Sequence, residues 1–150
     1  MSFDQVTNDE NMETKPLALG PADVVRITND AVDMEVLYAF EELQSDDGSD
    51  LIVELIDLYL QDAPQRIRAI REAAVAKEWV LLKRAAHNLK GGSCNLGVRH
   101  VAEICEQLER LECDHSPIDV EEFLKQLDHE FARASAAFLA ERRRRLQCEW

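Results

Sequence analysis

The sequence predicts an all-α protein, an antiparallel four-helix bundle with an additional N-terminal helix. Apolar residues recur at steps of three and four over long stretches, which is the period of one face of an α-helix. No stretch shows the alternation of apolar and polar residues that is typical of strands. The connections between the stretches are short, so consecutive helices are expected to bury their apolar faces against one another.

The N-terminal part of the chain precedes the expected bundle. Residues 1–22 are polar, contain Pro16, Gly20 and Pro21 and show little periodicity, which predicts a flexible acidic leader. A helical pattern starts at Asp30, and the sequence SDDGSD at 45–50 ends it. The domain is therefore expected to span residues 23–145, with residues 146–150 as a short tail.

Four further stretches each carry one apolar face. The first follows Asp50, a residue type suited to capping a helix N-terminus, and it contains Pro64, where a kink or local break is expected. Gly97 separates the second stretch from the third, and the loop CDHSPID at 113–119 precedes the fourth. The apolar positions are Ile52, Ile56, Tyr59, Ala63, Ile67, Ile70 and Ala74, then Leu82, Ala86, Leu89, Ser93 and Leu96, then Val98, Val101, Cys105 and Leu108, and finally Val120, Phe123, Leu124, Leu127, Phe131, Ala134 and Phe138.

The charge of the chain is unevenly distributed. The formal net charge is -13; residues 1–50 carry 13 acidic and 2 basic residues, and the remaining 100 residues carry 17 and 15. Binding to nucleic acids depends on Lys and Arg that neutralise phosphates. An acidic chain of this kind is therefore not expected to bind nucleic acid.

Targeting signals and cysteine spacing indicate a cytoplasmic protein. No apolar run approaches the roughly 18 residues that a transmembrane helix needs, and the N-terminus lacks the basic-then-apolar pattern of a signal peptide. No pair of cysteines has the C-x-x-C spacing, so reduced thiols are expected at Cys94, Cys105, Cys113 and Cys148.

A run of four arginines occupies residues 142–145. The simpler interpretation is a solvated end of the last helix, where cations interact favourably with the helix dipole. The alternative is a contact with an acidic partner or an anionic membrane surface. The sequence leaves both interpretations open.

His87 is the candidate catalytic residue. It follows Ala86 of the apolar stripe, so it lies about 100° around the helix, at the solvent side of the stripe. Its neighbours three and four positions away are Lys83, Arg84, Lys90 and Gly91. The window 79–102 contains four basic residues and no acidic one. These cations would stabilise a phosphoryl group on the imidazole, and Lys83 and Arg84 are candidates for supporting the phosphate or a partner.

Two adjacent glycines lie one turn beyond His87. A glycine inside a helix lowers its stability by about 1 kcal/mol relative to alanine, so a functional or packing role is expected for each of them. Gly91 would leave open space beside the imidazole, through which a reacting partner could approach. Gly92 is expected to allow close approach of a neighbouring helix.

The segment AHNLKGGSCNLGVRHVAEICEQLE, residues 86–109, resembles the phosphoacceptor segment of histidine-containing phosphotransfer (Hpt) domains. The core of that segment reads His-x-Leu-Lys-Gly-x-Ser followed by a Gly. The matching positions are His87, Leu89, Lys90, Gly91, Ser93 and Gly97. Residues 51–74 resemble the helix that precedes this segment in the family, and a compatible layout covers residues from about 34 to 140.

The resemblance implies a phosphoryl carrier of a multistep two-component phosphorelay. Its exposed histidine accepts a phosphoryl group from the aspartate of one receiver domain and passes it to the aspartate of another. Carried over by position, His87 would be the phosphoacceptor, Lys90 would steady the phosphate and Gly91 would give access. The expected partners are receiver domains of a hybrid histidine kinase and of response regulators. The receiver would supply a magnesium ion, so no metal, cofactor or ATP site is expected in this chain, and a monomer suffices.

One position departs from the pattern of the family. Some members have a Gln 22 residues after the histidine that hydrogen-bonds near the ring, whereas this chain has Glu109 there and Gln107 close by. Residues two apart on a helix point in different directions, so the supporting role stays unassigned between Glu109 and Gln107.

Three other interpretations remain. The dimerisation helix of a histidine kinase also carries a phosphorylated histidine, but it is typically followed by an acidic residue, where this chain has Asn88. A metal-binding bundle would need ligands at regular helical spacing, whereas His87, His100, His115 and His129 are 13, 15 and 14 residues apart. The third is a purely structural bundle, against which the intact motif argues.

Overall fold

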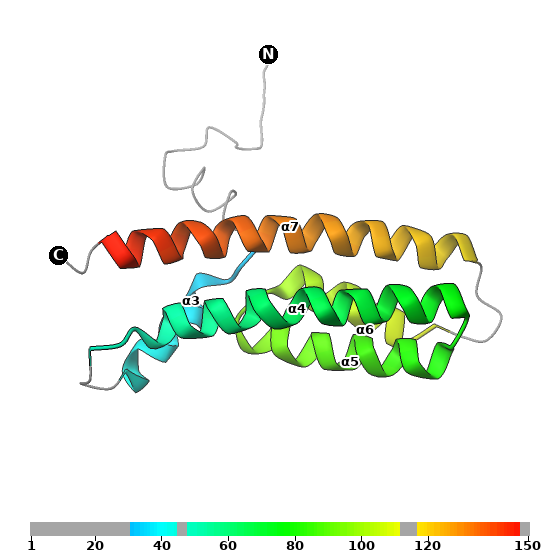
Figure 1. Ribbon diagram of the computed structural model, residues 1–150, viewed down its shortest axis with the longest axis horizontal. Helices are drawn as coiled ribbons and strands as arrows, with labels where there is room; N and C mark the ends of the chain where they lie inside the picture. Colours follow the sequence, from blue (N-terminus) through cyan, green and yellow to red (C-terminus); the bar gives the residue numbers. More distant parts are fainter. Residues whose placement is uncertain (1–30, 45–47, 112–116, 148–150) are drawn as a thin grey trace, which may run out of the picture. The chain divides into compact units, whose positions relative to one another are not determined.

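The computed structural model describes residues 31–44, 48–111 and 117–147 (Figure 1). The leader at 1–22, Cys113, His115 and Cys148 lie outside this part. The described elements, in chain order, are α3 (Met34–Tyr38), the 3-10 helix η1 (Ala39–Leu43), α4 (Leu51–Ala76), α5 (Trp79–Asn95), α6 (Arg99–Glu109) and α7 (Pro117–Gln147). These residues contain helices and no strand, so the predicted all-α class is confirmed.

Four of these helices form the bundle. α4 packs against α5, α5 packs against α6, and α7 contacts both α6 and α4; Figure 1 shows α7 and α4 side by side. Two short turns reverse the chain, at residues 77–78 and 96–98. Lys77 and Gly97 in these turns have φ values of 59° and 80°, in the left-handed region that ends many helices. The antiparallel bundle with an additional N-terminal helix is thus confirmed.

The N-terminal helix is shorter than the pattern from Asp30 predicts. α3 begins at Met34 and changes to a 3-10 helix at Ala39. The carboxylate of Asp33 caps α3 by accepting a hydrogen bond from the backbone N–H of Glu35 at 3.1 Å. This cap supplies a partner for one of the N–H groups that the first turn of a helix leaves unpaired.

α4 continues through Pro64, so the expected local break is not present. Asp50 caps this helix as predicted: its carboxylate accepts hydrogen bonds from the N–H groups of Ile52 at 2.9 Å and Val53 at 3.2 Å. Pro64 lies on the exposed side, where a proline removes one hydrogen bond of the helix. The rest of this 26-residue helix is held by its buried face.

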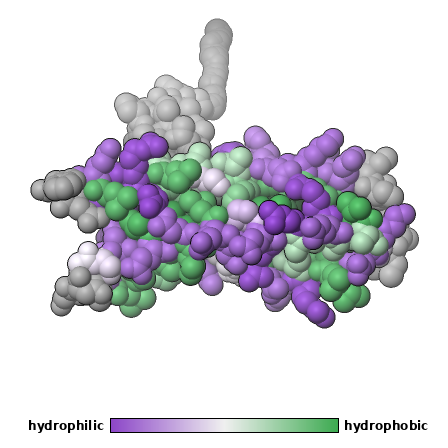
Figure 2. All heavy atoms as spheres, in the orientation of Figure 1, coloured by the Kyte–Doolittle hydropathy of each residue, from purple (hydrophilic) through white to green (hydrophobic). Residues whose placement is uncertain are grey.

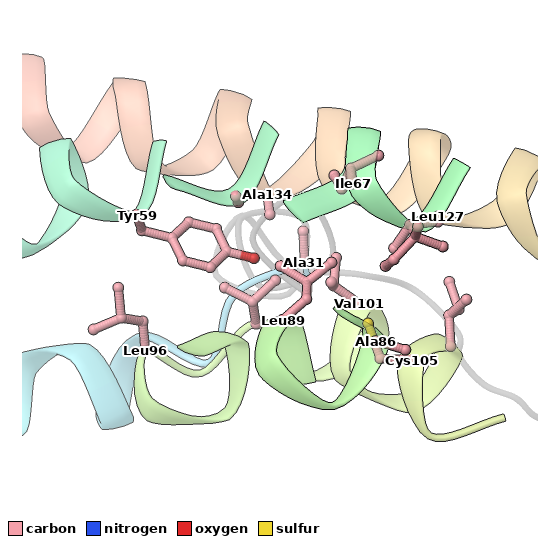
Figure 3. Close-up of a cluster of buried hydrophobic side chains, with 14 of the residues drawn as sticks. Ala31, Tyr59, Ile67, Ala86, Leu89, Leu96, Val101, Cys105, Leu127 and Ala134 are labelled. Carbon is pink, nitrogen blue, oxygen red and sulfur yellow. The ribbon is translucent and has the colours of Figure 1, made fainter. Parts of the chain in front are cut away.

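The core consists largely of the predicted apolar positions (Figure 3). The ring of Tyr59 points from α4 into this core and meets Phe138 of α7 edge-on, with 5.5 Å between the ring centroids. The hydroxyls of Tyr59 and Ser93 are 2.8 Å apart and hydrogen-bonded, and both residues are buried. Burial raises the pKa of Tyr59. Ser93, a residue of the motif, therefore faces the core and supplies the partner that a buried hydroxyl needs.

Gly97, another residue of the motif, holds the N-terminal segment. Its carbonyl accepts a hydrogen bond from the backbone N–H of Asp33 at 2.7 Å. A Cβ atom at Gly97 would lie 2.6 Å from the carbonyl oxygen of Asp33. Only a residue without a side chain fits both this close approach and a φ of 80°.

The arginines at 142–145 are not simply a solvated helix end. Arg142 pairs with Asp57 of α4 at 2.6 Å, Arg144 pairs with Glu141, and Arg145 pairs with Glu41 of η1. α7 continues to Gln147, so its last two residues fall within the stretch assigned to the tail. No helix in the described part of the chain is long and apolar enough to span a membrane.

Candidate functional site

His87 lies on the solvent-exposed side of α5. Its side chain is 66% exposed, whereas Ala86 and Leu89, on either side of it in the sequence, are buried. The helical period places the ring beside the apolar stripe, as the sequence predicts. A second molecule can therefore reach the imidazole.

Glu109, the last residue of α6, reaches across to the ring. Its Oε2 lies 2.8 Å from Nδ1 of His87, and its Oε1 lies 2.6 Å from Nζ of Lys90. The side chain of Glu109 is only 22% exposed. A carboxylate can only accept, so Nδ1 is the donor and carries the ring hydrogen. In the neutral ring, Nε2 then keeps the lone pair that a nucleophile needs.

The contact between Glu109 and Lys90 favours the charged form of both residues. Burial raises the pKa of Glu109, but the hydrogen bonds and charges of Lys90 and His87 outweigh it, so the pKa lies below its ordinary value. The contact with the Glu109 carboxylate raises the pKa of Lys90. At neutral pH a carboxylate therefore faces Nδ1, with an ammonium group on its other oxygen.

Gln107 does not share this position. It is exposed and lines a groove between α6 and α7, together with His100 and His129. Glu109 is thus the residue that contacts the imidazole, and sequence reasoning left it unassigned. The available signal was its position 22 residues after His87, where the resemblance places a supporting Gln.

The candidate cations lie on different sides of α5. Lys90 is held beside the site by Glu109, with 27% of its side chain exposed. Lys83 is half-buried and lies about 40° from His87 around the helix, one turn earlier. Arg84 instead lines a separate groove formed by the later part of α4 and the first part of α5, which is not the groove beside Gly92. Of these three cations, Lys90 is linked to the imidazole through the carboxylate of Glu109.

Both glycines of the motif face open space. Apart from its chain neighbours and the backbone of its own helix, a Cβ atom at Gly91 or at Gly92 would meet no atom within 4 Å. The open space expected at Gly91 is present, but the prediction that Gly92 permits a close helix contact is wrong. Gly92 instead lines a surface groove. The two glycines leave the backbone of α5 uncovered between His87 and this groove.

This α4–α5 groove is mostly apolar. Its walls come from η1, α4 and the C-terminal part of α5, and include the largely apolar set Phe40, Leu55, Leu58, Tyr59, Gly92 and Leu96 together with the polar side chains Gln61, Asp62, Gln65, Arg66 and Asn95. Figure 2 shows hydrophobic atoms at the surface in the region of η1 and the first half of α4. Exposed apolar surface of this kind is typical of sites where another protein binds.

The two other histidines that the structure describes, His100 and His129, line the groove between α6 and α7. Within the three described ranges, no group of three or more His, Cys, Asp or Glu is arranged to hold a metal ion. The thiols of Cys94 and Cys105 are free, the first exposed and the second buried. Burial raises the pKa of Cys105 to about 12.

Comparison with known proteins agrees with this geometry. The model of the Hpt domain family matches residues 54–137, which include α5 and α6. Among solved structures, the chain is similar to the histidine-containing phosphotransfer protein B (HptB) of Pseudomonas aeruginosa PAO1, at 29% identity and a TM-score of 0.63. The similarity covers 76% of this chain and 96% of that structure. None of the curated proteins matches the chain.

Proposed function

Since the chain belongs to the Hpt domain family and so takes part in histidine phosphotransfer within phosphorelays, we propose that His87 carries the phosphoryl group between the aspartates of two receiver domains. The observation that carries this proposal is the exposed imidazole whose Nδ1 is hydrogen-bonded to Glu109. Because Nδ1 carries the ring hydrogen, Nε2 is the nitrogen with a free lone pair, and it belongs to a side chain that is 66% exposed.

The chemistry of the transfer follows from the ring hydrogen. The lone pair of Nε2 attacks the phosphorus of the aspartyl phosphate, so an N–P bond forms while the P–O bond to the aspartate breaks and its carboxylate is released. The ring hydrogen stays on Nδ1, and the imidazole becomes positively charged. The carboxylate of Glu109, 2.8 Å away, opposes this charge. Transfer to the second receiver domain is the reverse of this step.

Lys90 would stabilise the phosphoryl group. Its ammonium is held near His87 by Glu109. Lys90 lies one turn of helix after His87, so its ammonium would be able to move from the carboxylate of Glu109 to an oxygen of the phosphoryl group on the ring. Lys83 and Arg84 would add positive charge around the site. A basic surface complements the acidic, magnesium-binding site that a receiver domain brings.

The α4–α5 groove is the proposed docking surface for the receiver domain. Its apolar walls give the partner a contact area, and the uncovered backbone at Gly91 and Gly92 lets the partner pass from the groove to His87. In this proposal the chain is a cytoplasmic, monomeric carrier. It has no cofactor or ATP site of its own, and it depends on the receiver domain for the metal ion.

A transfer assay tests the proposed function. Purified receiver domains are phosphorylated with labelled acetyl phosphate and mixed with the wild-type chain or with His87→Gln. Label that is stable to alkali, labile to acid and absent from His87→Gln is the expected result, because phosphohistidine has this stability profile. Label that persists on His87→Gln would move the phosphoacceptor to another residue.

A further inference from the structure

The end of the bundle next to the α4–α5 groove contains a cluster of charged side chains that the motif does not include. Arg145 of α7 lies among the carboxylates of Glu41 in η1, Asp50 before α4 and Glu141 in α7. We refer to these four residues as the C-terminal clamp. All four lie outside residues 54–137, the part that matches the family model.

Arg145 is the centre of the clamp. Its side chain is only 9% exposed. One guanidinium nitrogen donates a hydrogen bond to Glu41 at 3.1 Å, and Nε lies 3.6 Å from carboxylate oxygens of both Asp50 and Glu141. The guanidinium also lies 5.9 Å from the ring centroid of Tyr38, within cation–π range. Screening by salt is weak at such a covered position, so these interactions hold the elements together.

The clamp joins η1 to the rest of the domain. η1 has five residues, no side-chain cap and no fully buried residue, and Phe40 packs only partly buried against the core, so the contacts of Arg145 add to a limited apolar contact. The preceding helix is also tied to α7, because the hydroxyl of Tyr38 donates a hydrogen bond to Glu141 at 3.1 Å. Burial and then the charge of Glu141 raise the pKa of Tyr38. Two contacts from α7 therefore help to hold α3 and η1, in addition to the buried side chain of Leu37 and the hydrogen bond between Asp33 and Gly97.

η1 provides one wall of the α4–α5 groove. Phe40 lines the groove together with Gly92 and Leu96 of α5, and it is followed directly by Glu41, the residue that Arg145 holds. Without the guanidinium, the carboxylates of Glu41 and Asp50 would lose the cation that lies between them and Glu141, which keeps its pair with Arg144, and repulsion between the carboxylates would loosen η1. The position of Phe40 therefore depends on Arg145 as well as on its own packing against the core.

We propose that Arg145 is a positioning residue for partner docking, which fixes η1 so that Phe40 forms the wall against which the receiver domain binds. This inference rests on the proposed function. It assigns the last turns of α7 a part in partner affinity, although they lie far along the chain from His87. The transfer chemistry at His87 does not depend on it.

The test measures transfer from a phosphorylated receiver domain that labels the wild-type chain, at a series of receiver concentrations. Arg145→Gln is expected to raise the half-saturating receiver concentration about tenfold, the size typical of losing one well-packed contact at an interface. The limiting rate should not change. Labelling of His87 by phosphoramidate, a small donor that needs no docking, should also stay at the wild-type rate.

Three further variants make the test specific. Arg142→Gln is the matched control, since Arg142 lies on the same helix and pairs with Asp57 at 2.6 Å without contacting η1; it should behave as the wild type. Glu41→Gln should give a smaller rise than Arg145→Gln, because Arg145 keeps its other two carboxylates. Phe40→Ala removes the wall itself and should match Arg145→Gln.

Each outcome separates the two proposals. If Phe40→Ala raises the half-saturating concentration and Arg145→Gln does not, Arg145 has no positioning role. If Arg145→Gln slows labelling by phosphoramidate as well, it acts through the site or the fold, and the inference is overturned. No effect of Phe40→Ala would remove the groove as the docking surface. If no receiver domain labels the wild type, the proposed function itself fails.

Discussion

The motif residues of α5 lie in two regions of the molecule, the solvent-exposed site around His87 and the hydrophobic core. His87, Lys90 and Gly91 face solvent, where the imidazole, an ammonium group and open space meet. Leu89 and Ser93 face the core. A single helix thus carries a reactive face and a packing face, about half a turn apart.

This division explains why one short motif contains such different residue types. The exposed half can change without affecting the core, and the buried half can change without touching the imidazole. Substitutions in the buried half should therefore lower stability and leave transfer by the folded protein unchanged. Substitutions in the exposed half should change the rate of transfer and have little effect on the stability of the core.

The largest loss of stability is expected for Gly97→Ala. The added Cβ would lie 2.6 Å from the carbonyl oxygen of Asp33 at a φ of 80°, so backbone strain and a clash combine, and about 3 kcal/mol of unfolding free energy should be lost. Urea denaturation measures it. Gly48→Ala is the control, since Gly48 also has a positive φ of 90° but open space around it; it should lose about 1 kcal/mol. Equal losses would contradict the clash.

Ser93→Ala should have the next largest effect. It leaves the buried hydroxyl of Tyr59 without its partner at 2.8 Å, which typically costs about 1–3 kcal/mol. The double variant Tyr59→Phe/Ser93→Ala removes both polar groups and should recover part of this loss. Denaturation of the single and double variants measures the coupling, and transfer per folded molecule should equal that of the wild type. A double variant no more stable than Ser93→Ala would show that the two hydroxyls do not depend on each other.

The structure also separates what this sequence could predict from what it could not. The helices and their buried faces were predictable because period and capping are local properties, and Leu89 and Ala86 lie where the period places them. The contact of Glu109 with His87 depends on how α6 is rotated against α5, which spacing alone does not determine. Two of the three carboxylate partners of Arg145, Glu41 and Asp50, are about 100 residues away in the chain, so a run of arginines could not identify them. Gly92 faces a groove that three elements build together.

Glu109→Gln should change transfer more than stability at neutral pH. The amide can still accept the hydrogen bond from Nδ1, but it no longer opposes the positive charge of the phosphorylated ring. Transfer should slow roughly threefold to tenfold, since a charge-assisted hydrogen bond is about twice as strong as a neutral one. Glu109→Ala, which also removes the acceptor, should slow transfer further. Equal rates for the two variants would assign the effect to charge alone.

The same residue predicts a dependence of stability on pH. The pKa of Glu109 is lowered in the folded protein, so its contribution to stability is present above the ordinary glutamate pKa of about 4.3 and is lost as the pH falls through the folded value. Urea denaturation of the wild type and Glu109→Gln at pH 7 and near pH 3 measures this. The wild type should be the more stable at pH 7, and the difference should shrink at low pH. A difference that grows as the pH falls would contradict the assignment.

The smallest change in stability is expected at Gly91, where the effects of a side chain on stability and on transfer can be measured at one position. Gly91→Ala and Gly91→Gln should each stabilise the helix by up to about 1 kcal/mol, because a Cβ there, apart from its chain neighbours and the backbone of its own helix, meets no atom within 4 Å. Gly91→Ala adds little bulk and should transfer at nearly the wild-type rate. The longer side chain of Gly91→Gln would extend beside His87, one turn away, and should slow transfer from a receiver domain while leaving phosphoramidate labelling less affected. Wild-type transfer by Gly91→Gln would show that open space at Gly91 is not needed for access, and the glycine would then require another explanation.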